Sequence, residues 1–137
     1  MQKTITFLMF VGEQCGKAEE AIKFYTSLFK NSKVKSIERF NTGDAQGKEG
    51  TVKHALFTID GLEYMAIDSS LEHKFSFTPS ISIYVKCENE NEIKTLFDKL
   101  SVNGQVFMPL NKYPFSEKFG WLADKYGVSW QLNLTIE

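Results

Sequence analysis

The sequence predicts an α+β fold of two tandem βαβββ modules, which together form a curved, mostly antiparallel half-barrel sheet with the helices on its outer face. The first observation behind this fold is that a strand-like run followed by an amphipathic helix occurs twice, at the start and again after Pro79. The second is that each copy continues with three short strand-like runs. The third is that the last strand of each copy follows a turn dipeptide, Asp60-Gly61 or Tyr126-Gly127.

The first module is expected over residues 4–69 of a single 137-residue domain. Residues 4–11, TITFLMFV, are β-branched and aromatic and predict a buried strand. From Ala18 to Phe29 apolar residues recur at three- and four-residue spacing, which predicts an amphipathic helix ending near Asn31. Strands are then expected at about 33–41, 51–60 and 63–68, with the Gly-rich stretch 43–50 as an exposed loop.

The second module, expected over residues 79–134, repeats this order. The alternating run SISIYV predicts a strand, Asn89 to Asn91 supply helix caps, and a helix follows with Ile93, Leu96, Phe97 and Leu100 on its apolar face. Later strands are expected near 105–108, 119–124 and 128–134, and the run NKYPFSEK is expected to be a loop. Superposing the copies pairs Thr6 with Ser80, Phe10 with Tyr84 and Gly61 with Gly127.

Composition excludes several classes of protein. Sixteen basic and seventeen acidic side chains give a net charge of -1 without a block of one sign, so nucleic acid is not an expected partner. The N-terminal run shows no small-residue cleavage site, and no segment reaches the roughly 20 apolar residues of a membrane-spanning helix. We therefore expect a cytoplasmic protein. Cys15 and Cys87 lack the spacing of a zinc site and are expected to be free thiols.

The last strand predicts a small-molecule site by its alternation. Val128, Trp130, Leu132 and Leu134 would pack against the helix, which leaves Ser129, Gln131 and Asn133 on the concave side. Polar residues inside a half-barrel suggest a ligand site, and the Gln131 carboxamide can both donate to a polar ligand and accept from it.

Two segments resemble a known family. The run FGWLADKYGVSWQL, residues 119–132, and the helix AEEAIKFYTSLF, residues 18–29, are similar to the PhnB-like branch, also called 3-demethylubiquinone-9 3-methyltransferase-like, of the vicinal-oxygen-chelate superfamily. This superfamily has the glyoxalase and bleomycin-resistance fold. The resemblance implies paired βαβββ modules, a side-by-side or swapped homodimer, and a ligand cavity in each sheet.

The resemblance implies that metal-dependent members hold a divalent ion with four side chains, which come from the first and last strands of the modules. Those positions fall near Thr6, Met65 or Ile67, Ser80 and Gln131, of which only Gln131 is a suitable ligand. Asp68 would join it if the register of the fourth strand were shifted by one residue. We expect neither a metal nor another cofactor.

The methyltransferase part of the family's description is not supported by the sequence. The nearest candidate for a Gly-rich cofactor cradle is Gly12-x-x-x-Gly16, which is typical of a plain strand-to-helix turn.

Three further groups have both a functional and a structural interpretation. His54 either faces the cavity as a general base or is a solvent-side strand histidine, the latter being favoured. Cys15 precedes a helix, where a thiol pKa can fall, but Glu19 and Glu20 favour an inert thiol. Tyr113 and Phe115 flank a proline in a polar loop and suggest a lid or a dimer contact, whereas Trp121 would add to an apolar wall.

We expect a metal-free protein that binds a small, partly apolar molecule as a homodimer, with no catalytic residue assigned. One alternative is a superfamily enzyme of the lyase, isomerase or dioxygenase-like kind with metal held at a non-standard site. The other is a structural dimer without a ligand. The expected ligand contacts are Thr6, Met65, Ser80, Ser82, Tyr113, Phe115, Trp121, Ser129 and Gln131.

Overall fold

The computed structural model describes residues 1–135 and divides the chain into two compact units, Met1–Ser76 and Phe77–Glu137. Each unit contains one α-helix and one four-stranded sheet with the strand order of a βαβββ module. The expected α+β fold of tandem modules is therefore confirmed. Over the described residues, no helix combines the length and apolar character needed to cross a membrane.

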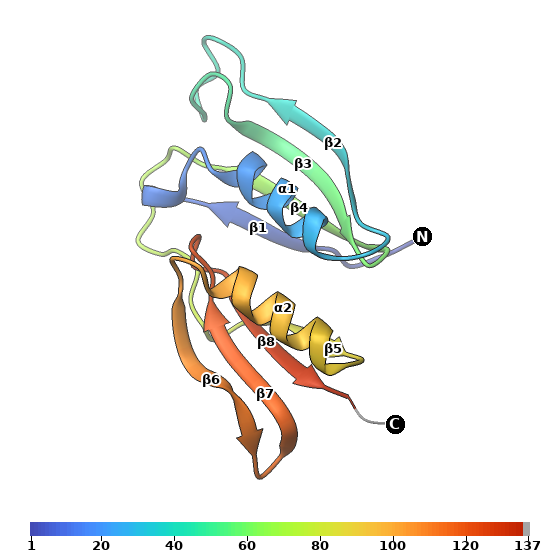
Figure 1. Ribbon diagram of the computed structural model, residues 1–137. Coiled ribbons are helices and arrows are strands. Elements are labelled where there is room, and N and C mark those ends of the chain that lie inside the picture. Colours follow the sequence, from blue (N-terminus) through green and yellow to red (C-terminus); the bar gives the residue numbers. More distant parts are fainter. Residues whose placement is uncertain (136–137) are drawn as a thin grey trace. The chain divides into compact units, whose positions relative to one another are not determined.

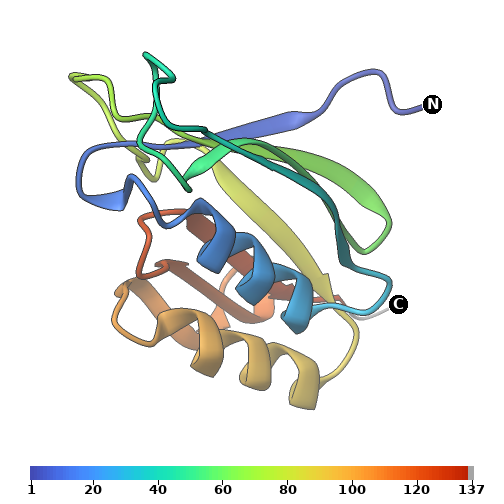
Figure 2. The ribbon, with the colours of Figure 1, turned by 90° about the horizontal axis from the view of Figure 1, so that it is seen from above.

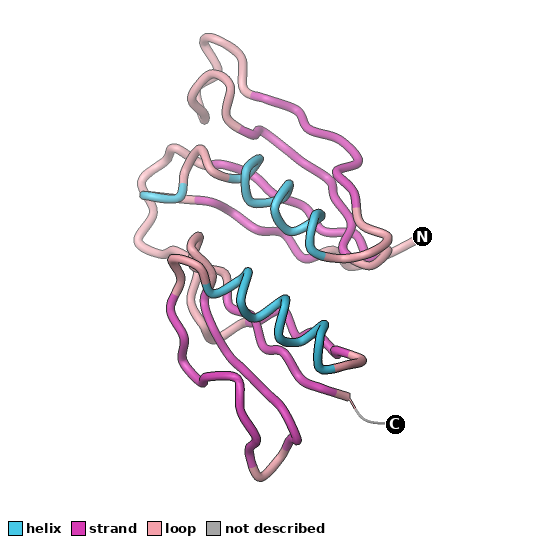
Figure 3. Tube along the Cα trace, viewed as in Figure 1, coloured by secondary structure: helices cyan, strands magenta, loops and turns pink. Residues whose placement is uncertain are grey.

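The first unit has its strands in the order β1-β4-β3-β2 (Figure 1). Strand β1 runs parallel to β4, whereas β3 is antiparallel to both of its neighbours. The long segment between β2 and β3 is a loop, as expected from its glycines (Figure 3). The elements are β1 (Thr6–Phe10), the 3-10 turn η1 (Gly12–Gln14), α1 (Ala18–Leu28), β2 (Lys33–Arg39), β3 (Val52–Ile59) and β4 (Leu62–Asp68).

The core of the first unit lies between α1 and one face of its sheet. Most of the predicted apolar stripe of the helix is buried, with Ala21, Ile22 and Tyr25 fully covered, whereas Leu28 and Phe29 at its end are partly exposed. The sheet contributes alternate residues, as expected for strands with one covered face. These sheet residues are Leu8, Phe10, Ala55, Phe57 and Ala66.

The second unit has the strand order β5-β8-β7-β6, with β5 parallel to β8 and the other pairs antiparallel. Helix α2 lies along one face of this sheet (Figure 2). The elements are β5 (Ser82–Cys87), α2 (Glu90–Ser101), β6 (Gln105–Tyr113), β7 (Ser116–Ala123) and β8 (Ser129–Leu134).

The apolar face of α2 is the one expected from the sequence, since Ile93, Leu96, Phe97 and Leu100 are all buried. The strands β7 and β8, which contact this helix, contribute the fully buried Leu122, Trp130 and Leu132. Gly120 permits the close approach, because a Cβ atom there would lie 2.5 Å from the Phe97 ring. The close packing of α2 on this sheet therefore requires a glycine in β7.

The hairpin between β3 and β4 confirms the Asp60-Gly61 prediction. Asp60 and Gly61 have φ angles of 50° and 81°, the pair of positive values that a type I′ turn requires.

The prediction that the run NKYPFSEK is a loop is wrong, because β6 continues to Tyr113 and β7 starts at Ser116. Only Pro114 and Phe115 lie between the strands, and Tyr113 pairs with Ser116. Much of this hairpin is exposed, so its polar side chains lack the hydrophobic alternation that reveals a strand. Backbone pairing nevertheless maintains the strands.

The superposition of the first strands is also wrong, by three residues. The Ser69 amide donates to the Phe10 carbonyl, and at the equivalent place the Thr135 amide donates to the Cys87 carbonyl. Phe10 therefore corresponds to Cys87, which makes Phe7 the counterpart of Tyr84. The reason is the connection to the helix: the first unit needs residues 11–17, including η1, whereas the second needs only residues 88–89.

Candidate functional site

The predicted polar residues of β8 lie on the sheet face opposite α2. Trp130 and Leu132 are fully buried on the helix side, so their neighbours Ser129 and Gln131 point to the other face. Ser82 is the strand partner of Ser129. Three of the predicted ligand contacts thus share one face of one sheet.

These side chains form a hydrogen-bonded group with Trp121, which we call the serine–glutamine cluster: Ser82, Trp121, Ser129 and Gln131. The two serine Oγ atoms are 2.7 Å apart. The Trp121 indole Nε1 donates to Ser129 Oγ at 2.9 Å, and Gln131 Nε2 donates to Ser82 Oγ at 3.3 Å. The cluster joins β5, β7 and β8, so its side chains are held in fixed positions.

Aromatic rings flank the cluster. Phe107 of β6 lies against Trp121 with ring centroids 4.8 Å apart. At the end of the same hairpin, Tyr113 and Phe115 stack at 5.7 Å, and Phe115 meets Phe119 edge-on at 5.0 Å. The predicted lid residues therefore lie at the tip of the β6–β7 hairpin, where Phe115 remains 64% exposed.

Five predicted contacts are not part of this cluster: Tyr113 and Phe115 at the hairpin tip, and Ser80, Thr6 and Met65. Ser80 precedes β5 and is exposed, with its hydroxyl 2.7 Å from that of Thr78. Thr6 and Met65 belong to the first unit. Thr6 alternates with the buried Leu8 and Phe10 and so shares their helix-side face of β1.

On the sheet face of the first unit that points away from α1, apolar side chains meet across β1, β4 and β3. Phe7 is the strand partner of Met65, and Met65 is also the partner of Leu56. The His54 ring lies 5.9 Å from the Phe7 ring, edge to face. As expected, the His54 side chain points to the sheet face opposite the one that carries Ala55, and its ring lies beside that of Phe7.

The residues at the family's metal positions do not fit a divalent ion. The observed registers place Phe7, Met65, Tyr84 and Gln131 at the four strand positions, and only the Gln131 carboxamide is an oxygen donor of the usual kind. Sequence superposition missed Phe7 and Tyr84 because it could not detect the longer first connection. Among residues 1–135, no three His, Cys, Asp or Glu side chains are grouped so that they could hold a metal.

Asp68, the other suspected ligand, is buried on the helix side. Its Oδ1 accepts from the amides of Gly16 at 2.7 Å and Ala18 at 3.1 Å, and its Oδ2 accepts from the Val52 amide at 2.9 Å. The carboxylate therefore already accepts hydrogen bonds from the amides of Gly16 and of Ala18, the first residue of α1. A nucleotide-type cofactor does not fit there, because the donors that would cradle its phosphates are already bonded.

Asp124 is a second buried carboxylate, and sequence reasoning missed it. It accepts from the amides of Tyr126 and Val128 and, at 2.9 Å, from the Trp130 indole. The signal was present in Asp124-Lys-Tyr-Gly127, since an aspartate before a Gly-containing turn is typical of a side chain that bonds the turn backbone. Part of the run GWLADKYGVSWQ is therefore structural.

Neither cysteine has the environment of a reactive thiol. Partial burial, and then the charge of Asp68, raise the pKa of Cys15 above its usual value. Burial, and then Glu92, raise the pKa of Cys87 to about 12. Both thiols stay protonated near neutral pH.

Comparisons with known proteins agree on one family. Residues 2–133 match the family described as 3-demethylubiquinone-9 3-methyltransferase. A solved structure of a putative 3-demethylubiquinone-9 3-methyltransferase, PhnB protein, from Bacillus cereus is 59% identical, with a TM-score of 0.91 and coverage of 98% of this chain and 100% of that one.

More distant relatives were also found. Protein YjdN of Escherichia coli is 28% identical over 89 residues, which is 65% of this chain but only 60% of that protein. Protein PA1353 of Pseudomonas aeruginosa shares the fold at 21% identity, with a TM-score of 0.80 and full coverage of both chains. A glyoxylase/bleomycin resistance protein/dioxygenase domain from Frankia shares it at 13% identity, with a TM-score of 0.66 and coverage of 99% and 98%.

Proposed function

Because this chain belongs to the 3-demethylubiquinone-9 3-methyltransferase family, the PhnB-like branch of the glyoxalase/bleomycin-resistance/dioxygenase superfamily, we propose that it binds a small, partly apolar molecule without a metal. The binding surface is the face of the β5–β8 sheet that points away from α2. The serine–glutamine cluster supplies its polar contacts. The rings of Phe107 and Trp121 supply its apolar wall.

The observation that carries the proposal is the serine–glutamine cluster itself. Two hydroxyls, a carboxamide and an indole converge from three strands on a partly exposed face beside aromatic rings. Ligand sites typically combine such an apolar wall with a few fixed polar groups. A polar group that is already oriented by a neighbour also loses less side-chain entropy when the ligand binds.

The chemistry of the cluster favours binding over catalysis. The hydrogen bonds of Ser82 and Ser129 go to each other and to Gln131 and Trp121. None of these partners is a base that could activate a serine hydroxyl as a nucleophile. The carboxamide and the indole orient a ligand and do not transfer protons near neutral pH.

We also propose that the protein is a homodimer and is located in the cytoplasm. Large apolar side chains such as Ile81, Tyr84 and Phe115 are more than half exposed in the single chain and would suit a subunit contact.

Native mass spectrometry of protein purified without an affinity metal tests the proposal. We expect a dimer that carries no metal, and a co-purified organic compound or an aromatic compound from a screened set that binds one per subunit. The Gln131→Leu variant should bind this compound more weakly than the unaltered protein, whereas Gln105→Leu, on the exposed start of β6, should bind it equally well.

Three results would contradict the proposal. Stoichiometric uptake of Zn, Ni, Mn or Fe(II), measured by elemental analysis, would support a lyase, isomerase or dioxygenase-like enzyme instead. Equal ligand binding by Gln131→Leu and the unaltered protein would move the site away from the cluster. A metal-free dimer that binds none of the screened compounds would support a structural role.

A further inference from the structure

We propose that the site selects a neutral ligand whose polar edge has a hydrogen-bond donor beside an acceptor, as in a carboxamide, lactam or urea attached to an aromatic ring. This inference rests on the proposed function and adds the chemical class of the ligand. It follows from how the protons of the serine–glutamine cluster are distributed.

Two of the donors in the cluster have a definite direction. The Trp121 Nε1 group can only donate, and its proton goes to Ser129 Oγ. The Gln131 Nε2 group donates to Ser82 Oγ. With its amino group turned toward Ser82, the other end of the Gln131 carboxamide, Oε1, is left as an acceptor on the half-buried side chain.

The two serines share one hydrogen bond, so one of their two hydroxyl protons is used between them. Ser129 is only 2% exposed, whereas Ser82 is partly exposed. A buried hydroxyl costs free energy unless its proton is bonded. The favourable arrangement has Ser129 donating to Ser82, which leaves the Ser82 proton for a ligand. The site thus offers an O–H donor on Ser82 next to the Gln131 Oε1 acceptor.

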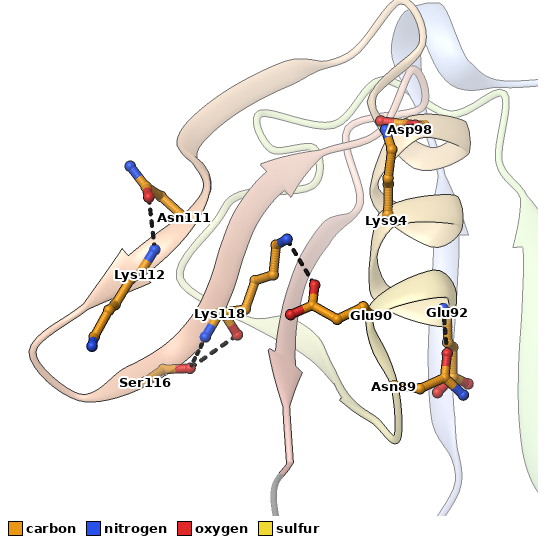
Figure 4. A network of polar contacts seen from close by, with 9 residues as sticks. All are labelled: Asn89, Glu90, Glu92, Lys94, Asp98, Asn111, Lys112, Ser116 and Lys118. Atoms are coloured by element: carbon orange, nitrogen blue, oxygen red, sulfur yellow. Dashed lines mark hydrogen bonds and ion pairs between the residues drawn. The ribbon is translucent and has the colours of Figure 1, made fainter.

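Charge around the cluster argues against an ionic ligand. None of the four cluster residues is charged. On the same face the charged residue of β5 is Lys86, the strand partner of Asn133. It is four residues from Ser82, about 13 Å at the usual strand rise. Lys118 of β7 is instead bonded to Glu90 of α2 at 2.8 Å (Figure 4). A carboxylate or phosphate at the cluster would therefore lose its hydration without gaining a partner charge.

The test uses four probes that share a phenyl ring: benzamide, N,N-dimethylbenzamide, benzoate and benzamidinium. Binding is followed by the NMR signal of the Trp121 indole N–H, which lies inside the cluster, and the Trp130 indole N–H serves as an internal reference. Benzamide should bind most tightly. N,N-dimethylbenzamide lacks the N–H donor, benzoate lacks the donor and carries a negative charge, and benzamidinium lacks the acceptor and carries a positive charge. Each should bind about tenfold more weakly than benzamide, because one cluster group is left unbonded.

Two variants sharpen the test. Gln131→Leu removes the acceptor and should reduce the preference for benzamide over N,N-dimethylbenzamide to near unity. Gln131→Glu keeps the shape but adds a negative charge, so it should favour benzamidinium. Gln105→Leu is the matched control and should keep the original order.

The outcomes separate this inference from the proposed function. If benzoate or N,N-dimethylbenzamide binds as tightly as benzamide, the face still binds aromatic molecules, but the neutral donor–acceptor edge is wrong. If no probe moves the Trp121 signal, both the inference and the binding role of this face fail.

Discussion

Two buried aspartates show how single side chains hold this fold together. Asp68 joins the end of β4 to the start of α1 and to β3 through three backbone amides. Asp124 joins the β7–β8 turn to the Trp130 indole. In each case a carboxylate replaces water for buried N–H groups that would otherwise be unbonded. Both residues are structural, although one of them was a suspected metal ligand.

At the residue scale we predict that Asp68→Asn is destabilising. An asparagine has one carbonyl oxygen, so its amino group must face at least one of the three N–H donors, two of which make buried hydrogen bonds. We expect a loss of about 2 kcal/mol in the free energy of unfolding, measured by urea denaturation.

Asp60→Asn is the matched control for Asp68→Asn. Asp60 is exposed in a turn with φ of 50°, a conformation that asparagine adopts readily. The free energy of unfolding of Asp60→Asn should stay within about 0.5 kcal/mol of that of the unaltered protein. Equal stability of the two variants would show that the amide contacts of Asp68 contribute little.

At the scale of the element, α2 has a side-chain cap at its N-terminus. The Asn89 side chain accepts from the Glu92 amide at 2.8 Å (Figure 4). The Glu92 carboxylate in turn accepts from the Glu88 amide at 2.7 Å. Helix α1 has no side-chain cap from its N-cap residue, Lys17, and uses the distant Asp68 instead. The two units thus solve the same problem with a local residue in one case and a distant one in the other.

This difference predicts that Asn89→Ala is destabilising by about 1 kcal/mol, because the Glu92 amide loses its acceptor. Asn91→Ala changes the same residue type two positions later, within the helix, where alanine is a good helix former. Thermal unfolding should therefore show a lower Tm for Asn89→Ala and an unchanged or higher Tm for Asn91→Ala. The reverse order would show that Asn89 does not cap the helix.

At the scale of the whole molecule, each unit has its own hydrophobic core. In the second unit, Leu132 is fully buried in β8 on the α2 side of the sheet. In the first, α1 covers an equivalent set on its own sheet. Two separate cores allow the two units to open with different free energies.

We predict that Leu132→Ala accelerates amide hydrogen exchange most in β7, β8 and α2. The cavity should cost about 3 kcal/mol, and the strands β3 and β4 should be less affected. Hydrogen exchange read by mass spectrometry would measure both units in one sample.

Leu62→Ala is the control for this exchange experiment, since Leu62 is 58% exposed in β4 and its loss should leave exchange nearly unchanged. Equal acceleration in both units by Leu132→Ala would show instead that the chain opens as one cooperative unit.

Local patterns determined much of this protein from its sequence. The spacing of Ile93, Leu96, Phe97 and Leu100 predicted the buried face of α2, and Asp60-Gly61 predicted a hairpin. The alternation of residues 128–134 predicted that Ser129 and Gln131 share one face of their strand. Such predictions succeed because helix period, strand period and turn conformation depend on neighbours in the chain.

Only the tertiary structure decided which residues meet. Ser82 and Ser129 are 47 residues apart and join through a parallel strand pair, whose register no local pattern specifies. A change of one position in a strand moves a side chain to the other face, so Phe7 and not Thr6 points away from α1. The buried role of Asp68 likewise depends on amides 16 to 52 residues away. Register and burial are set by the packing of distant segments, and the candidate site was therefore only partly visible in the sequence.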